Sequence, residues 1–191
     1  MIVETGLLEN GSTIEVHIDE DTQNPRKEWD NATVFVLGHR RYDLSNEHGF
    51  DLMSYAGSDK DIDEIEQDLL DEIGVDALVV KVWAYDHSQF RLMTRQPTAS
   101  LFGVYLMDYG FVGFVYMTAA TIAYEYGTGN DADEKAQALI EAEISTYNKY
   151  LNGEVYGYVI KDDDDEIVDS CWGFYDRDYM VEEATRIAEA V

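Results

Sequence analysis

Acidic residues are the feature that most constrains how this chain can fold. Of 191 residues, 40 are Asp or Glu and 13 are Lys or Arg, which gives a formal net charge of −27 at pH 7. The acids run along the whole chain, and only residues 162–166 form an uninterrupted acidic tract. Because a carboxylate is costly to bury without a partner, a compact fold must keep nearly all of them in solvent. We therefore expect a negatively charged surface over the entire molecule.

The apolar residues are nevertheless sufficient for a core. They make up 46% of the chain, with 14 Tyr, 7 Phe and 3 Trp, and the length suits one domain over residues 1–191. No stretch approaches the roughly 20 apolar residues of a membrane span, and the first residues do not read as a signal peptide. A single cysteine, Cys171, excludes an internal disulfide and a cysteine-rich zinc site. We expect a cytoplasmic protein without contact to a membrane.

Two interpretations of the charge stay open. One is adaptation to a cytoplasm rich in salt, where a Debye length of about 3 Å at molar salt removes most of the repulsion between carboxylates. The other is mimicry of nucleic acid, in which carboxylates imitate phosphates and occupy a basic DNA-binding protein. Direct binding of nucleic acid is disfavoured, because 13 cationic side chains in this field do not make a strong basic patch unless they cluster.

Apolar periodicity predicts a mixture of strands and helices. Helices are expected where apolar residues recur at helical spacing, the first one capped by Ser58 with Asp61: residues 58–73, 118–126, 131–151 and 179–190. Strands are expected at residues 13–18, 32–37, 77–85, 89–94, 104–107, 111–117, 155–160 and 167–174. Because the order lacks a regular strand–helix–strand rhythm, the pattern predicts a single α+β domain, a mostly antiparallel sheet with about three to four helices packed on it.

Polar residues with catalytic potential fall in loops and at strand ends. A histidine base, aspartates that orient it and an arginine clamp for an anion would together form a site. The catalytic candidates are His39, Arg41, His87, Asp108 and Asp169. The binding candidates are Asp30, Asn31, Arg40, Arg41, Tyr42 and Ser88. The alternative is structural: the arginines pair with surface carboxylates, and the histidines are satisfied within the fold.

No pattern indicates a metal or a cofactor. The histidines and aspartates lack the spacing of a metal motif on a helix. The tract at residues 162–166 lacks the alternating ligands and the glycine of a calcium loop, so it reads as the solvated tip of a hairpin. Cys171 alternates with Trp172 on a predicted strand and is expected in the core.

Several segments, taken in order, resemble a family of small phage and mobile-element proteins of unknown activity. They are Asn24-Pro25-Arg26 with Asp30-Asn31, His39-Arg40-Arg41-Tyr42, Asp86-His87-Ser88, residues 107–114, Tyr147 to Tyr158, and Asp169 to Tyr175. The chain departs from the family pattern at Met107, where the family carries Trp, and at Tyr109, where it carries Ser. The resemblance implies a viral or mobile-element origin, here in an acidic version suited to a salt-loving host.

The residues favour a function in binding over one in catalysis, since no complete catalytic motif is present. We expect a viral accessory protein in the host cytoplasm that acts on a protein partner, for which a basic DNA-binding protein is one candidate in counter-defence or DNA mimicry. Two alternatives stay open. One is a small hydrolase or nucleic-acid-processing enzyme that uses the His/Arg/Asp loops, and the other is a structural component of a virion.

Overall fold

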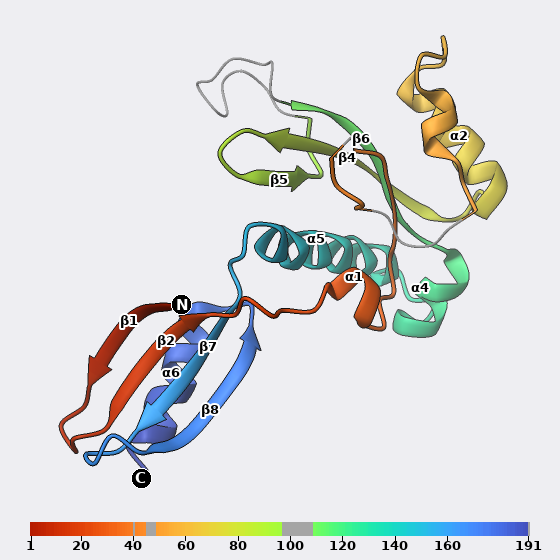
Figure 1. Ribbon diagram of the computed structural model, residues 1–191. Coiled ribbons are helices and arrows are strands. Elements are labelled where there is room, and N and C mark those ends of the chain that lie inside the picture. Colours follow the sequence, from red (N-terminus) through yellow and green to blue (C-terminus); the bar gives the residue numbers. More distant parts are fainter. Residues whose placement is uncertain (40, 45–48, 97–108, 191) are drawn as a thin grey trace. The chain divides into compact units, whose positions relative to one another are not determined.

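The computed structural model describes residues 1–39, 41–44, 49–96 and 109–190. It confirms the predicted α+β class, and every strand pairing in the described chain is antiparallel. The strands form two four-stranded sheets where the sequence pattern suggested one (Figure 1). The contacts within the chain separate two compact units, unit 1 with residues 1–25 and 149–191, and unit 2 with residues 26–148.

Unit 1 is a sheet with the strand order β1-β2-β7-β8, covered on one face by a helix (Figure 1). Its elements are β1 (Ile2–Leu7), β2 (Thr13–Ile18), β7 (Tyr156–Lys161), β8 (Ile167–Phe174) and α6 (Arg177–Ala188). Because side chains alternate along a strand, Ile14 and Val16 face the helix, where they pack against Met180 and Ala184. Asp176 caps α6 by accepting a hydrogen bond from the backbone N–H of Tyr179.

A β-bulge changes the register of the β7–β8 hairpin. Tyr156 pairs with Phe174 but Tyr158 pairs with Cys171, so two residues of β8, Trp172 and Gly173, stand opposite one residue of β7. Gly173 has φ of +86°, which an L side chain rarely adopts. The bulge therefore depends on glycine at this position. Trp172 lies on the face of the sheet opposite α6, against His17, and Phe174 after the bulge lies on the α6 face.

Unit 2 is a sheet with the strand order β3-β6-β4-β5 between helices on both faces (Figure 1). Its elements are α1 (Pro25–Glu28, from the last residue of unit 1), β3 (Val34–Leu37), the 3₁₀ turn η1 (Leu52–Tyr55), α2 (Ile62–Ile73), β4 (Leu78–Asp86), β5 (Phe90–Met93), β6 (Tyr109–Met117), α4 (Ala119–Tyr126) and α5 (Ala132–Leu151). On one face Ile65 and Leu69 of α2 pack against Phe114. On the other face Tyr147 of α5 lies edge-on against Phe35 of β3, with ring centroids 5.8 Å apart.

Most predicted elements are confirmed, with shifts of one turn or less. Helix α2 begins after Asp61, which forms a capping box with Glu64, so the predicted cap at Ser58 is wrong. Strand β1 was not predicted. The strand expected at residues 104–107 lies outside the described residues. Cys171, expected in the core, is exposed because the bulged strand β8 is the edge of its sheet.

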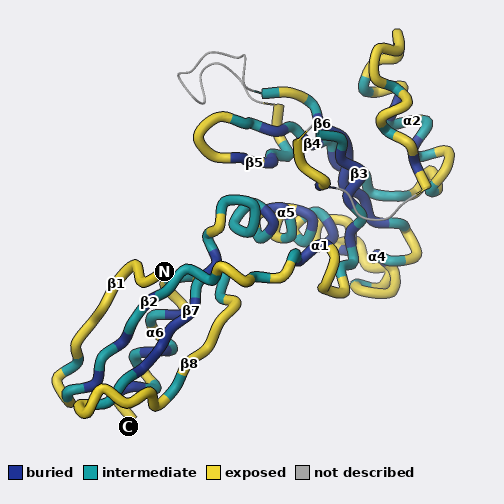
Figure 2. The backbone as a smooth tube through the Cα atoms, in the orientation of Figure 1, coloured by how far each residue is buried: buried dark blue, intermediate teal, exposed yellow. Residues whose placement is uncertain are grey.

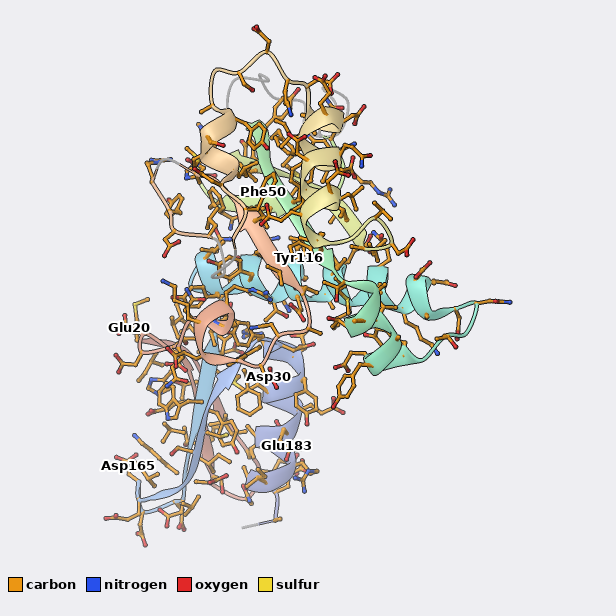
Figure 3. All side chains as sticks on the ribbon, turned by 90° about the vertical axis from the view of Figure 1, so that its right-hand side faces the viewer. Glu20, Asp30, Phe50, Tyr116, Asp165 and Glu183 are labelled. Carbon is orange, nitrogen blue, oxygen red and sulfur yellow. The ribbon has the colours of Figure 1, made fainter. Side chains whose placement is uncertain are left out.

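The carboxylates lie at the surface, as expected. In the described part of the chain the buried polar or charged residues are Ser12, Arg26 and Thr33, and none of them is acidic. Figure 3 shows Asp165 and Glu183 projecting outward, whereas Phe50 and Tyr116 lie within unit 2. Over the same residues, no helix combines the length and the hydropathy that crossing a membrane requires.

Candidate functional site

The structure brings two of the predicted polar loops of unit 2 together around one carboxylate. Asp86, the last residue of β4, accepts an ion-paired hydrogen bond from the guanidinium of Arg41. The same Oδ2 lies 3.6 Å from Nε2 of His39, which is beyond normal hydrogen-bond length. Asp86 raises the pKa of Arg41 through that hydrogen bond. This pairing matches the structural alternative for the arginine, in which a surface carboxylate neutralises it.

Aromatic rings hold the histidine of this cluster in place. The His39 ring stacks on Tyr42 at a centroid distance of 5.1 Å and meets the edge of Phe90 at 5.1 Å. Tyr42 in turn contacts Phe90 at 4.8 Å. A shallow hollow of about 420 Å³ lies beside these rings, lined by Leu37, Gly38, His39, Arg41, Tyr42, Asp43, Leu44 and Met53. The packing fixes the imidazole, which suits a structural role as well as a binding one.

Two further candidates sit in the turn between β4 and β5. The ring of His87 is 6.3 Å from that of Tyr85, and His87 does not line the hollow beside His39. Ser88 is exposed at the tip of the turn. Because neighbouring side chains at the end of a strand point to opposite sides, His87 and Asp86 do not face one direction.

The pair Asp30 and Asn31 belongs to a different group of unit 2. Asn31 accepts a hydrogen bond of 2.9 Å from Arg26, and Asp30 is exposed. Arg26 is buried, pairs with Glu143 of α5, donates to the carbonyl of Thr33 at 2.7 Å, and lies 3.8 Å over the Phe35 ring. Burial lowers the pKa of Arg26, and Glu143 opposes that change. This network joins α1, β3 and α5, so its role is structural.

The last described candidate belongs to unit 1. Asp169 of β8 accepts a hydrogen bond of 3.0 Å from the hydroxyl of Tyr158, across the β7–β8 ladder. Burial, and then this bond, raise the pKa of Tyr158 to about 12. The carboxylate of Asp169 is therefore already engaged in a hydrogen bond within the sheet. Arg40 and Asp108, also predicted as site residues, lie outside the described residues.

The loop cluster offers little for catalysis. Its carboxylate is neutralised by Arg41, and the backbone N–H of Arg41 donates a hydrogen bond of 3.3 Å to Nδ1 of His39. The described residues also contain no group of three or more His, Cys, Asp or Glu side chains placed to hold a metal ion. A general base acts only when the group whose proton it accepts lies at hydrogen-bond distance.

A second candidate site, which the sequence analysis missed, is the face of the unit 1 sheet opposite α6, here called the open face. Its centre is polar: Glu15 of β2 accepts a hydrogen bond of 2.8 Å from Lys161, and its other carboxylate oxygen is 3.1 Å from Nε2 of His17. The hydrogen bond from Lys161 is the main cause that lowers the pKa of Glu15. The Trp172 ring meets the edge of His17, with centroids 5.4 Å apart.

Exposed apolar side chains surround this polar centre. The register places Ile2 opposite His17 and Leu7 opposite Thr13 on the same face, with Ile167 opposite Lys161. The exposed fractions are 51% for Ile2, 76% for Leu7, 64% for Ile167 and 47% for Trp172. Figure 2 shows both edge strands, β1 and β8, as exposed over most of their length. In the sequence, the alternation of β2 indicates that this strand has a second, polar face. It does not show which other strands contribute side chains to that face.

Comparison of the chain with protein-family models, with curated proteins and with solved structures finds no match.

Proposed function

We propose that this protein is a viral or mobile-element accessory protein that binds another protein in the host cytoplasm through the open face of unit 1. The observation that carries the proposal is the set of apolar side chains exposed on that face, Ile2, Leu7, Ile167 and Trp172. Apolar side chains exposed to water are unfavourable, and several of them gathered on one face are typical of a protein interface. Tryptophan in particular is enriched among the residues that dominate binding energies.

The charge around the open face indicates the chemistry of the partner. Unit 1 carries 18 acidic and 4 basic residues, and three of the four basic residues are paired with carboxylates of the same unit. A surface of this kind repels nucleic acid and attracts lysine and arginine. The proposed partner is therefore a protein whose apolar contact patch is surrounded by basic residues. A DNA-binding protein presents such a surface, which keeps DNA mimicry within the proposal.

The loop cluster supports binding less than the open face does, and catalysis least. Arg41 and Asp86 satisfy each other, and aromatic packing confines His39. A hydrolase would need these groups to turn toward a substrate, which requires breaking that ion pair. A virion component would instead use the open face to bind further copies of the chain.

Charged substitutions on the open face test the proposal. Leu7→Asp and Ile167→Asp change side chains that are largely exposed, so the fold should persist, as circular dichroism can verify. The wild-type protein, immobilised in molar KCl, is expected to retain a basic protein from host lysate. The identified protein is then purified, and its Kd is expected to rise at least about tenfold for each variant, because one apolar contact is replaced by a buried charge.

A matched control distinguishes this surface from the rest of the molecule. Tyr124 of α4 in unit 2 is 86% exposed, and Tyr124→Asp should leave the Kd within about twofold of the wild-type value. Equal affinity of the wild type and both open-face variants for the purified partner would refute the proposal. Concentration-dependent self-association of the pure wild type, lost in Leu7→Asp, would favour the virion alternative and contradict the proposed partner.

A further inference from the structure

Two arginines of unit 2 differ in their pairing from the other cationic side chains of the described chain. Of the twelve Lys and Arg residues that the structure describes, nine form ion pairs with carboxylates, and Lys149 donates to the carbonyl of Tyr175. Arg91 and Arg95 are the remaining two. Among the described residues neither has an ion pair or a side-chain hydrogen bond. With acids three times as numerous as bases, an unpaired arginine is the less expected state.

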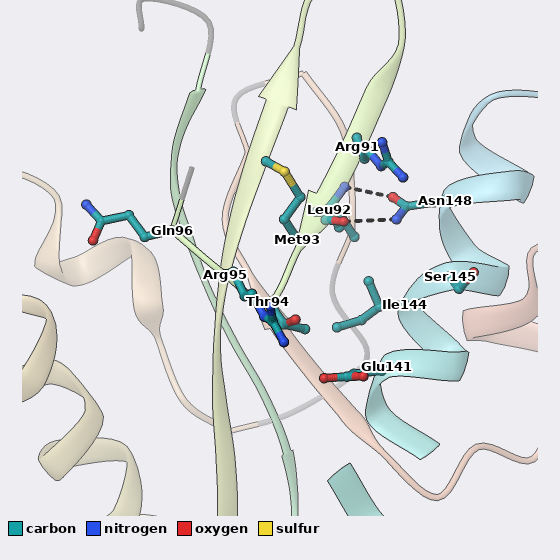
Figure 4. A pocket seen from close by; sticks show the side chains of 10 residues that line it. All are labelled: Arg91, Leu92, Met93, Thr94, Arg95, Gln96, Glu141, Ile144, Ser145 and Asn148. Atoms are coloured by element: carbon teal, nitrogen blue, oxygen red, sulfur yellow. Dashed lines mark hydrogen bonds between the residues drawn. The ribbon is translucent and has the colours of Figure 1, made fainter. Parts of the chain in front are cut away.

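Both of these arginines line the same hollow. It has a volume of about 640 Å³ and lies between β5 with the residues that follow it and helix α5 (Figure 4). The side of the strand contributes the two arginines with Leu92, Met93, Thr94 and Gln96, and the helix contributes Glu141, Ile144, Ser145 and Asn148. The size is within the range of about 300–1,000 Å³ that small-molecule sites occupy.

The wall of the hollow is held rigidly by one side chain. Strand β5 is at the edge of its sheet, so Leu92 has a backbone N–H and C=O that no neighbouring strand bonds. Asn148 of α5 satisfies both: its Oδ1 accepts from the N–H at 2.7 Å, and its Nδ2 donates to the carbonyl at 2.9 Å (Figure 4). The helix thus acts as the next strand would, and it fixes the distance between the two walls.

We infer that this hollow binds a small molecule with an oxyanion, phosphate or carboxylate, attached to an apolar body. The guanidinium group matches both oxyanions through paired N–H donors, and no carboxylate among the described residues pairs with either arginine. The apolar part of the lining comes from Leu92, Met93 and Ile144, of which Met93 is the most exposed, while the hydroxyl groups of Thr94 and Ser145 add donors. Glu141 is the one carboxylate among the described residues of the lining, and two arginines outweigh it.

Titration calorimetry with simple probes tests this site. The protein is held in KCl at a concentration that keeps it folded, and the probes are phenyl phosphate, phenylacetate, phenol and inorganic phosphate. One site per chain is expected for phenyl phosphate or phenylacetate, with a Kd of about 1 mM or lower. Phenol lacks the oxyanion and inorganic phosphate lacks the apolar body, so each should bind at least about tenfold more weakly. The better of the two anionic probes identifies which oxyanion the site prefers.

Three variants that each remove one positive charge distinguish binding at this site from the effect of the overall charge of the protein. Arg91→Gln and Arg95→Gln should each raise the Kd about tenfold, because each loses one charge-assisted contact. Lys135→Gln makes the same change in net charge at an ion pair with Asp131, which lies outside the hollow, and should stay within about twofold of the wild type. The inference is overturned if neither anionic probe binds at about 10 mM, if phenol binds equally well, or if all three variants bind alike.

Discussion

The indole of Trp172 lies directly against the backbone of Gly157, where a Cβ would come within 2.3 Å of its Cε3 atom and 2.9 Å of the carbonyl oxygen of Cys171. The residue opposite the bulge must therefore be glycine for Trp172 to rest on the sheet. We predict that Gly157→Ala destabilises unit 1 by about 1–3 kcal/mol, the usual cost of overpacking. Urea unfolding at constant salt, followed by circular dichroism and tryptophan fluorescence, measures this change.

A second glycine of the same sheet is the control for that substitution. A Cβ at Gly6 of β1 meets no atom within 4 Å, and its φ is not positive. Gly6→Ala should leave the stability unchanged or raise it by a few tenths of a kcal/mol, because alanine has less freedom to lose on folding. Similar losses in both variants would contradict the close contact between Trp172 and Gly157.

The buried ion pair of unit 2 gives the second prediction. The side chain of Arg26 is 2% exposed and pairs with Glu143, so Arg26→Met leaves a carboxylate without its partner in a largely buried place. We expect a loss of about 3–5 kcal/mol in the unfolding free energy of unit 2. The adjacent Lys27 pairs with Asp43 in solvent, with side chains 51% and 73% exposed, and Lys27→Met should cost no more than about 1 kcal/mol.

A double variant tests whether the loss comes from the stranded charge. Arg26→Met combined with Glu143→Met removes both charges and should be more stable than Arg26→Met alone. A double variant as unstable as the sum of its parts would mean that packing of Arg26 on Phe35, not charge, is what the first substitution removes.

The helices of this fold could be predicted from sequence because their signals are local. The stripe of Ile65 and Leu69 in α2 and the periodic apolar residues of α5 appear within a few turns of chain. The division into two sheets could not be predicted in this way. Strand β2 pairs with β7, at residues 156–161, and an apolar alternation defines a buried face without naming its partner.

The candidate sites show the same limit. From the sequence, His39, Arg41 and Asp86 are polar residues in loops, and the fold brings them together. The sequence did not show that Asp86 neutralises Arg41. The one error in β8 concerns Cys171. Alternation separates Cys171 from Trp172 correctly, but it does not show that β8 is the edge of its sheet, which is why Cys171 is exposed.

Alkaline pH should destabilise unit 1 through Tyr158. Its pKa is raised to about 12 in the folded state, against about 10 in an unfolded chain, so the neutral phenol is favoured by folding. The resulting stabilisation is complete below about pH 10 and is lost as the pH rises toward 12, because the unfolded state releases its proton first. Unfolding free energies measured across this range, with tyrosine ionisation followed by ultraviolet absorbance, should show the decline.

The variant Tyr158→Phe isolates this contribution from the titration of lysines. It removes the hydrogen bond to Asp169, so it should be less stable near neutral pH, but its stability should fall less steeply above pH 10 than that of the wild type. Tyr124→Phe, at an exposed phenol, should keep the wild-type slope. Parallel slopes for the wild type and Tyr158→Phe would show that the phenol ionises equally in both states.

Salt should stabilise the fold, because the acidic side chains lie at the surface. With a net charge of −27 and no acidic residue buried in the described chain, repulsion between surface carboxylates opposes folding most strongly at low ionic strength. Raising KCl from about 0.1 M to 1 M shortens the Debye length from about 10 Å to 3 Å, so the unfolding free energy should rise steeply over this range. Thermal and urea unfolding by circular dichroism at each salt concentration measure the slope.

Charge reversal at the hairpin tip separates screening from other effects of salt. Asp163 and Asp164 are exposed members of the acidic tract, and neither side chain has a hydrogen bond or ion pair in the described structure. Replacing both by lysine lowers the magnitude of the net charge by four, so the variant should be more stable than the wild type at low salt and should gain less from added KCl. Equal gains for the two proteins would indicate that KCl acts through apolar burial, since that effect does not depend on charge.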